Sequence, residues 1–455
     1  MPSSSLASAP GVALRADWFY EVRFDGAELV VEGTFDAHHD SMFSADDDAA
    51  PYFRQVEISQ GDSWTAVTKV GTSWRATCPK GCRLRYRFAL KQACTALAEA
   101  DTAIASGNVF ISPPSTWLLH PGGAAQGATF ELHVDPGNAQ FVTALQPVSS
   151  AEPRRYLADT SVLDDASFAA FGGLQVTEVP AGDATVQLGV APERLGLSLE
   201  QASAWISDSA GAVANFYRGH LPARHALVLL MRGSGGSTRG ITLGGGGAGV
   251  LVRSSDQVNP KTTRDDWVTT HELFHANFPD IGRGHAWFTE GMATYLEPIA
   301  RARVGLVSEA KLWRDLVDGL PQGLPEAGDQ GLEHTRTWGR TYWGGALFCF
   351  VADVTLRERT SNQHTLDDVL LAIGKTGASD QDYWPIQRVL DAATNATGTP
   401  VLQELYARLA EKPGTVDLPG LFARLGVRVQ GASVVFDDAA PLAKLRRSIA
   451  ARSPG

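Results

Sequence analysis

The sequence predicts a multidomain α+β protein, in which an antiparallel β-sandwich is followed by a mixed region of strands and helices and then by a mostly helical C-terminal region. Its 455 residues exceed what one hydrophobic core usually holds. Apolar and polar residues alternate in the first third of the chain, whereas apolar residues recur at helical spacing in the last third. We place a flexible N-terminus at 1–16, the sandwich at 17–150, a central domain at 151–303 and the helical region at 304–455.

The composition is typical of a soluble globular protein, because 44% of the residues are hydrophobic and 20% are charged. The formal net charge is −11, and no basic cluster is present that could neutralise phosphates, which argues against a nucleic-acid partner. No apolar run approaches the length of a membrane span. The sequence leaves the oligomeric state open.

The N-terminus and the cysteines bear on the cellular compartment. Residues 1–16 lack the basic start and the apolar stretch of a signal peptide, although a trimmed signal would leave such a stub. Cys78 and Cys82 are spaced to close a disulfide across a turn, which favours a periplasmic or secreted protein over a cytoplasmic one. Two free thiols are the alternative, and a zinc knuckle would need ligands that Cys94 alone cannot supply. Cys349 fits a buried helix position.

The sandwich is predicted from four alternating runs that are separated by turn residues. We expect strands at 18–24, 28–35, 83–88 and 129–134, and a short helix at 90–105. Two polar clusters, His38-His39-Asp40 and Asp46-Asp47-Asp48, contain residue types that bind metals. Their spacing matches no known geometry of metal ligands. We therefore predict a solvated acidic loop there.

The central domain is predicted to combine strands with an intervening helix. Strand-like runs occupy 173–179, 185–190 and 226–231, and 199–218 has helical apolar spacing. Gly244, Gly246 and Gly249 match the dinucleotide-binding pattern Gly-x-Gly-x-x-Gly, which requires a helix to begin after the glycines. Because 250–253 is strand-like instead, we reject a nucleotide site.

The motif His-Glu-x-x-His at 271–275 indicates a metal site. On a helix, His271 and His275 project from one face and can bind one metal ion. Glu272 lies one position round the helix, close to the metal but free to accept a proton from the attacking water as a general base. A structural helix with incidental histidines is the alternative. The motif is expected by chance about one time in a hundred in a chain of this length, so the motif alone does not exclude that alternative.

The residues around the motif favour the metal site. Residues 262–266 form a capping-type helix start, and Pro279 ends the helix soon after the second histidine. A second helix is expected to begin near Ala286 and to carry Glu290 in its first turns. A catalytic zinc takes three protein ligands and keeps one open position. We therefore predict one Zn²⁺ per chain, held by the two histidines and Glu290.

The last region is predicted to be mostly helical. A threonine followed three residues later by an aspartate, typical of a capping box, begins the run at 365–373. Other runs with helical apolar spacing lie at 308–316, 342–359 and 400–410. A late strand is expected at 427–436, and a basic tail follows it.

The order of these parts resembles a known family. The pattern His-Glu-x-x-His, followed by Trp-x-x-Glu-Gly-x-x-x-Tyr-x-Glu, resembles the gluzincin metallopeptidases, the thermolysin-like group in which a Glu on the next helix is the third zinc ligand. The second pattern is matched by Trp287, Glu290, Gly291, Tyr295 and Glu297. Within the group, the chain is most similar to the glycyl aminopeptidase family over residues 17–445, without the PDZ domain that follows in many members.

The resemblance implies a zinc-dependent peptidase. Residues 151–303 would form a thermolysin-like catalytic domain, and 304–455 would complete its cleft. Peptides would be the substrates, cleaved from a free N-terminus by a water molecule that zinc activates. A Gly-rich edge strand would bind the substrate backbone through Gly245, Gly246, Gly247 and Ala248.

The Gly-rich strand departs from the family's pattern. Related aminopeptidases carry in this motif a Glu whose carboxylate holds the free amine of the substrate, and no Glu lies between Gly244 and Val252. Glu333 and Asp280 are candidates for that role. One alternative is therefore a zinc endopeptidase without recognition of the free amine. Another is a non-catalytic binding protein on a peptidase fold, although the intact Glu272 argues against it.

Two further residues are expected near the metal. Tyr342-Trp343-Gly344-Gly345 resembles the family's Tyr-x-Lys-Gly element, with Gly344 in place of the lysine. Tyr342 would therefore donate a hydrogen bond to the oxyanion of the tetrahedral intermediate, and a buried aromatic residue is the alternative. Glu297 shares the helix face of Glu290 and is expected to accept a hydrogen bond from a ligating imidazole, which would fix its tautomer.

Overall fold

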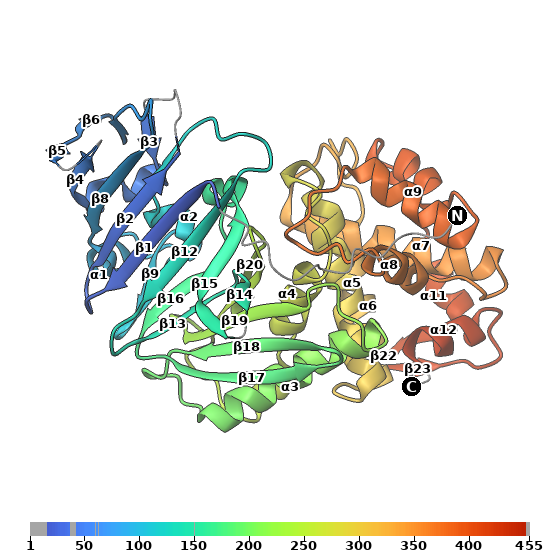
Figure 1. Ribbon diagram of the computed structural model, residues 1–455. Coiled ribbons are helices and arrows are strands. Elements are labelled where there is room, and N and C mark those ends of the chain that lie inside the picture. The colour runs from blue at the N-terminus through green and yellow to red at the C-terminus, as the bar shows by residue number, and fades with distance from the viewer. Residues whose placement is uncertain (1–15, 37–41, 60, 62, 150, 452–455) are drawn as a thin grey trace.

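The computed structural model describes residues 16–36, 42–59, 61, 63–149 and 151–451. The predicted flexible N-terminus, except for residue 16, and the cluster at 38–40 lie outside these residues. Figure 1 shows three regions that follow one another along the chain: a β-rich N-terminal region, a central sheet with helices, and a C-terminal region of helices. This arrangement agrees with the predicted multidomain α+β class.

The N-terminal region is built from three sheets and two short helices. Across the largest sheet the strands are β14 (Pro147–Ser149), β15 (Glu152–Asp159), β12 (Thr129–Asp135), β1 (Trp18–Phe24), β2 (Leu29–Phe35), β8 (Cys82–Phe88), β4 (Phe53–Ser59) and β5 (Trp64–Ala66). The second sheet consists of β13 (Gln140–Thr143), β16 (Ala169–Gly172), β10 (Val109–Ile111) and β9 (Ile104–Ser106). The third consists of β11 (His120–Pro121), β3 (Met42–Ser44), β7 (Ser73–Arg75) and β6 (Thr68–Val70), and the helices are α1 (Leu90–Ala96) and α2 (Pro114–Trp117).

Three predictions about this region need correction. β1 pairs in parallel with β12, with Trp18 opposite Phe130, so the largest sheet is mixed rather than antiparallel. The predicted boundary at 150 falls within the hairpin of β14 and β15, and the sheets of this region continue to Gly172. The predicted helix at 90–105 ends at Ala96, because 104–106 pairs as β9. The pairings of β1 with β12 and of β16 with β10 join strands that are distant in sequence, which local spacing does not record.

The cysteine predictions are confirmed. Cys78 and Cys82 form a disulfide, and Cys94 and Cys349 are free and buried. Burial raises the pKa of the Cys94 thiol to about 12, so this thiol stays protonated at neutral pH and is not a nucleophile.

In the second acidic cluster, Asp46-Asp47-Asp48, the Asp46 carboxylate accepts a hydrogen bond from the backbone N–H of Asp48 at 2.9 Å and caps a short 3-10 helix.

The central sheet positions the edge strand of the candidate site. Across the sheet the strands are β17 (Gln175–Ala181), β18 (Ala184–Val190), β19 (His225–Arg232), β21 (Ala248–Ser254) and β20 (Arg239–Leu243). The middle three strands are parallel, whereas β17 and β20 are antiparallel edge strands. The strand predicted after the glycines is confirmed, since β21 occupies Ala248–Ser254 where the dinucleotide-binding pattern would require a helix.

Both faces of this sheet are buried, which explains the unbroken apolar run of β19. Val228 and Leu230 pack into the core shared with the helices, whereas Leu227 and Leu229 pack against the N-terminal region. Helix α3 (Leu199–Phe216) covers β17 and β18, close to the predicted range 199–218. The sheet therefore holds its edge strand β20 between the N-terminal region and the helices.

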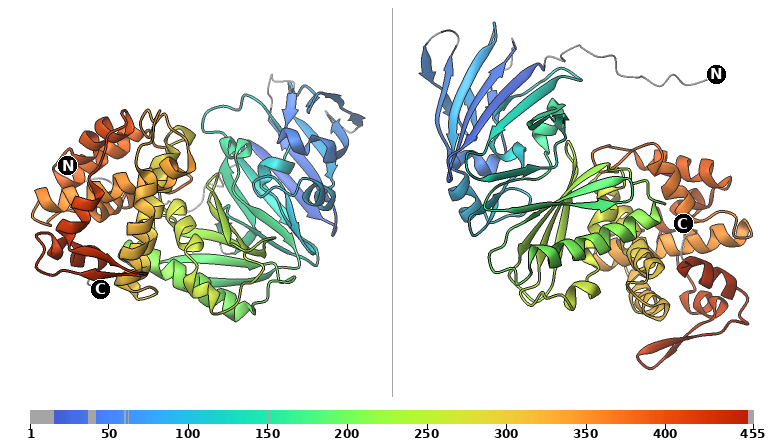
Figure 2. Two further views of the ribbon diagram at one scale, coloured as in Figure 1. Left: turned by 180° about the vertical axis from the view of Figure 1, so that it is seen from behind. Right: turned by 60° about the horizontal axis from the view of Figure 1, so that its bottom comes forward.

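The helices of the remaining chain carry the metal-ligand motif and then form the C-terminal region. They are α4 (Val268–Ala276), α5 (Ala286–Val304), α6 (Glu309–Gly319), α7 (Gly345–Arg359), α8 (Leu366–Gly374), α9 (Ile386–Thr397), α10 (Val401–Leu405), α11 (Leu418–Leu425) and α12 (Ala443–Ala450). In both views of Figure 2, the last of these gather at the end of the molecule far from the N-terminal strands. The predicted late strand is a hairpin of β22 (Val427–Gln430) and β23 (Ser433–Phe436). Among the described residues, no helix is both long and apolar enough to cross a membrane.

Candidate metal centre and active-site cleft

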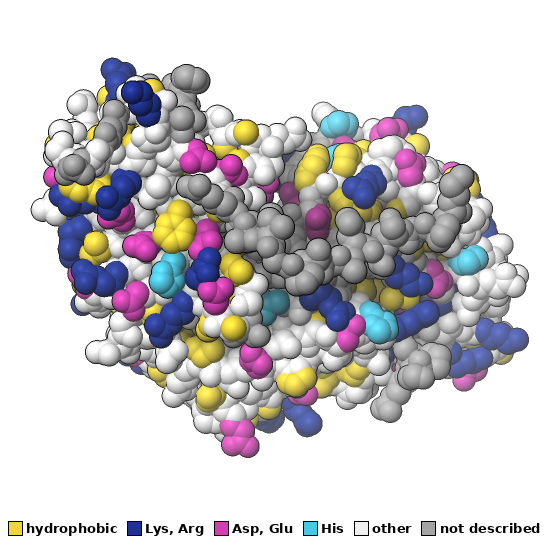
Figure 3. All heavy atoms as spheres, in the orientation of Figure 1, with side chains coloured by type: hydrophobic (Ala, Val, Ile, Leu, Met, Phe, Trp, Pro, Cys, Tyr) yellow, Lys and Arg dark blue, Asp and Glu magenta, His cyan; other side chains and the backbone are white. Residues whose placement is uncertain are grey.

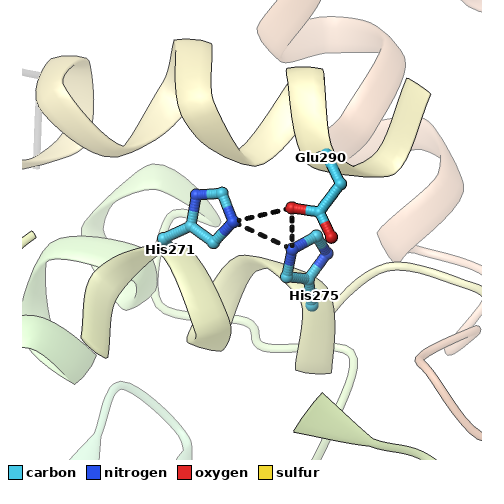
Figure 4. A group of neighbouring side chains, drawn as sticks. All are labelled: His271, His275 and Glu290. Atoms are coloured by element: carbon cyan, nitrogen blue, oxygen red, sulfur yellow. Dashed lines mark hydrogen bonds and ion pairs between the residues drawn. The ribbon is translucent and has the colours of Figure 1, made fainter. Parts of the chain in front are cut away.

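Three side chains of types that commonly bind metals meet between two neighbouring helices, as Figure 4 shows. His271 and His275 lie on one face of α4, and Glu290 points toward them from α5. The Asp266 carboxylate accepts a hydrogen bond from the backbone N–H of Thr269 at 3.0 Å and satisfies an open donor at the start of α4. α5 begins at Ala286, as the sequence predicts. The sequence thus placed both helices that carry the candidate ligands.

The spacing of the three donor groups fits a tetrahedral metal ion. The Nε2 atoms of His271 and His275 lie 3.1 Å apart, and one oxygen of Glu290 lies 3.1 Å and 3.4 Å from them. Donor atoms at about 2.0–2.1 Å from zinc, in a tetrahedron, would lie roughly 3.3 Å from one another. In the part of the chain that the structure describes, no other group of three or more His, Cys, Asp or Glu side chains converges in this way.

Burial and charge both act on this group. Burial alone would lower the pKa of His275, but the Glu290 carboxylate outweighs it and raises that pKa to about 9. Burial would raise the pKa of Glu290, yet the two histidines hold it well below its usual range. The centre therefore stabilises positive charge. A zinc ion would supply that charge, and its binding would displace the proton from the imidazole.

Glu272 lies beside the donor group without belonging to it. The Thr242 hydroxyl lies 2.7 Å from its carboxylate and 3.1 Å from its backbone carbonyl. Gly240 has no room for a Cβ, because the Glu272 side chain packs directly against it. The edge strand β20 therefore holds this carboxylate in place. Sequence reasoning missed the contact, because Thr242 lies thirty residues before its partner with no motif between them.

Tyr342 reaches the centre from a π-helical turn at Arg340–Gly344 that leads into α7. Such turns occur often at functional sites. The Tyr342 ring stacks on the His271 ring, with the ring centroids 6.3 Å apart. Burial and the carboxylates of Glu290 and Glu272 raise the pKa of Tyr342 to about 12. Its hydroxyl therefore stays protonated near neutral pH and is available as a donor.

A cleft of about 380 Å³ opens beside these residues. It is lined by Gly240, Ile241, Thr242, Arg253, Glu272, His275, Phe278, Pro279, Asp280, Thr289, Glu290, Tyr342 and Asp380. Asp280 and Asp380 add two carboxylates that belong neither to the donor group nor to the motif. Burial raises the pKa of Asp380 to about 7, against the opposing effect of His275. No local pattern marks Asp380, which lies in the connection between α8 and α9.

The four residues predicted to bind the substrate backbone, Gly245, Gly246, Gly247 and Ala248, do not line this cleft. A Cβ at Gly245, Gly246 or Gly247 would collide with Asp165, Leu145 or Ala144 of the N-terminal region. Ala248 is buried, with 2% of its surface exposed. These glycines let the two regions pack closely. The part of the hairpin that lines the cleft is 240–242.

Glu297 has a different partner from the one predicted. Its carboxylate is buried and lies 3.3 Å from the guanidinium of Arg301. The Nδ1 atom of His271 has no hydrogen-bond partner among the residues that the structure describes. Burial raises the pKa of Glu297 to about 8, although Arg301 acts in the opposite direction. The predicted hydrogen bond from an imidazole to Glu297 is therefore not formed in this structure.

The two candidates for binding the substrate amine differ in position. Glu333 accepts a hydrogen bond from the Tyr406 hydroxyl and pairs with His285, each at 2.8 Å, and it does not line the cleft. Asp280 does line the cleft, is exposed, and accepts a hydrogen bond from the backbone N–H of Gly282 at 2.7 Å. The geometry therefore favours Asp280 over Glu333.

Comparison with known proteins finds no matching family model and no matching curated protein. Solved structures do match the fold. An aminopeptidase N family protein from Idiomarina loihiensis has a TM-score of 0.69 and 16% identity, over 91% of this chain and 79% of that one. An M1 zinc metallopeptidase from Deinococcus radiodurans has a TM-score of 0.51 and 14% identity, over 89% and 96%. A mutant M1 enzyme from that organism, bound to a Tyr-Ser-Ala substrate, has a TM-score of 0.53 and 14% identity, over 88% and 94%. The chain thus has the fold of these zinc peptidases.

Proposed function

We propose that this protein is a zinc-dependent metallopeptidase that removes residues from the free N-terminus of peptides. The observation that carries the proposal is the convergence of His271, His275 and Glu290 beside a separate carboxylate, Glu272, in an open cleft. The fold shared with M1 zinc metallopeptidases supports it. The three donors would hold one Zn²⁺ per chain and leave a coordination position open.

The carboxylate, the hydroxyl and the edge strand that line the cleft have separate roles in this reaction. Zinc, when bound, would lower the pKa of a water molecule and polarise the peptide carbonyl. Glu272, held by Thr242, accepts a proton from the attacking water and then passes it to the leaving amine. The Tyr342 hydroxyl donates a hydrogen bond to the oxyanion that develops on the carbonyl. An extended substrate lies along β20, whose outer edge offers backbone hydrogen bonds.

The amine of the substrate is assigned to Asp280 and Asp380. Both line the same cleft as Glu272, and their segments meet, since Asp280 forms an isolated β-bridge with Tyr383. An ammonium group bound between two carboxylates gains charge-assisted hydrogen bonds. These residues would replace the Glu that the Gly-rich motif lacks. The glycyl aminopeptidase type belongs to this proposal on the resemblance of the motifs alone.

Peptides with free and acetylated N-termini test the proposal. We expect the free peptide to be cleaved at least about tenfold more efficiently, because acetylation removes the charge that the carboxylates bind. Equal cleavage of both peptides would support a zinc endopeptidase instead. If a preparation that contains stoichiometric zinc cleaves neither the free nor the acetylated peptide, the result would support the alternative of a non-catalytic binding protein. Product analysis by mass spectrometry shows which bond is cut.

Replacing Tyr342 with phenylalanine is expected to lower kcat by about 10²–10³-fold with little change in KM. The lost hydroxyl acts mainly in the transition state, so binding of the ground state should be unaffected. Steady-state kinetics measure both constants. Tyr52→Phe, at the end of a short helix in the N-terminal region, is the matched control. An unchanged kcat in Tyr342→Phe would support the alternative of a buried aromatic residue.

A further inference from the structure

Two arginines face each other at the edge of the central sheet without an acidic partner. Arg239 on β20 lies directly opposite Arg253 on β21. Like charges in this position destabilise a sheet. Within the described part of the chain, neither guanidinium forms an ion pair or a hydrogen bond. Some strand arginines are paired, as Arg83 is with Glu32, whereas Arg23 and Arg75 stand singly on their strands without an ion pair among the described residues. Arg239 and Arg253 differ from these in lying opposite each other. Basic and acidic side chains are interspersed over the face in Figure 3.

The arginine pair lies where two cavities adjoin. Arg253 lines the cleft that contains Glu272 and the donor group. Arg239 and Arg253 also line a neighbouring cavity of about 760 Å³. That cavity contains two carboxylates, Glu193 and Asp256, and neither is paired with these two arginines. A ligand that extends from the cleft into the neighbouring cavity therefore passes the guanidinium groups of Arg239 and Arg253, whose positive charges are not paired with a carboxylate of the described residues.

The opposite end of β20 is acidic. Gly244 follows the strand, and the backbone and side chain of Asp380 pack so closely against it that a Cβ has no room. Glu272 contacts the middle of the strand through Gly240 and Thr242. From Arg239 to Leu243 the strand has five residues, which span roughly 16 Å at about 3.3 Å per residue. This is about the length of an extended peptide of a few residues.

We propose that Arg239 and Arg253 form a carboxylate-binding subsite that binds the C-terminal carboxylate of short peptides, on the leaving side of the scissile bond. Guanidinium groups offer donor pairs that match a carboxylate, and the bound anion removes the repulsion between the two arginines. This inference rests on the proposed function and narrows its substrates to peptides of about two to four residues with both ends free. The ammonium end binds at Asp280 and Asp380, and the carboxylate end binds at the arginine pair.

Peptide amides test the subsite. The wild-type enzyme is expected to cleave Ala-Ala-Ala with a kcat/KM at least about tenfold higher than that for Ala-Ala-Ala-amide, the effect of losing a hydrogen-bonded charge. Arg253→Gln and Arg239→Gln are each expected to remove this preference by lowering kcat/KM for the free acid only. Activity on the amide shows that each variant is folded. Arg23→Gln, an exposed strand arginine of the N-terminal region, keeps the preference.

The source of the carboxylate is tested with Ala-Asp-Ala-amide. Cleavage at the low rate of the plain amide supports the assignment to the C-terminal carboxylate. Cleavage at the rate of the free acid assigns the subsite to an acidic side chain and overturns that assignment. Equal kcat/KM for the free acid and the plain amide in the wild-type enzyme overturns the subsite itself.

Binding separates this inference from the proposed activity. In Glu272→Gln, calorimetric titration is expected to show at least about tenfold weaker binding of Ala-Ala-Ala-amide than of the acid. Adding Arg253→Gln should remove the difference. If the wild-type chain hydrolyses no peptide but this difference is present, the subsite is supported and the proposed activity fails. If both peptides are hydrolysed and bound equally, the subsite is overturned and the peptidase activity stands.

Discussion

Replacing Glu272 with glutamine is expected to lower kcat for peptide hydrolysis by about 10²–10⁴-fold while stoichiometric zinc stays bound. Glutamine keeps the size of the side chain and can still accept the hydrogen bond from Thr242. It cannot accept a proton from the attacking water, so the general base is lost. Steady-state kinetics and metal analysis on one preparation measure the two properties together.

The control for this variant is Glu200→Gln, an exposed carboxylate in the first turn of α3. It removes the same charge far from the cleft and should leave kcat unchanged. Full activity in Glu272→Gln would refute the assignment of the base. Loss of zinc together with activity would place Glu272 among the metal ligands, against its position outside the donor group.

Replacing His275 with alanine is expected to abolish stoichiometric zinc binding and, with it, activity. Only His271 and Glu290 of the donor group remain, and two ligands do not make a stable catalytic zinc site. The wild-type chain should contain one zinc ion and lose thermal stability when a chelator removes it. A ligand that binds only the folded state stabilises it by about 4 kcal/mol at a concentration of 1,000 times its Kd.

The chelator should leave the melting temperature of His275→Ala unchanged, because no bound zinc remains to be removed. His133→Ala, on an exposed position of β12, is the matched control and should behave like the wild-type chain. A wild-type chain that contains no zinc and is indifferent to chelators would contradict the metal centre. It would favour the non-catalytic binding protein on a peptidase fold.

The signals that predicted the metal centre are local in sequence. The spacing of four between His271 and His275 fixes a shared helix face, and the helix that carries Glu290 begins at the predicted Ala286. The capping box predicted at Thr365 is formed at the start of α8. A helix is stabilised by contacts between residues three or four positions apart. A short stretch of sequence therefore largely determines where the helix begins and ends.

The sheets were predicted less well, because strand pairing depends on residues that are distant in sequence. Several long strands were found, whereas β4, β15 and β20 were missed. The parallel pairing of β1 with β12 joins residues more than a hundred positions apart. The same holds for the boundary, since β16 pairs with β10 of the first region although it follows residue 150. Hydrophobic alternation shows which face of a strand is buried, but it does not show which strand lies beside it.

By itself the sequence determined the three candidate metal ligands, the candidate base and the helices that carry them. Only the tertiary structure decided what surrounds them. It placed 240–242, and not the predicted segment 245–248, along the cleft, and it brought Asp380 to one end of β20 and Arg253 to the other. The physical reason is that the motif needs only one turn of helix, whereas a cleft is made by segments that meet through packing far apart in the chain.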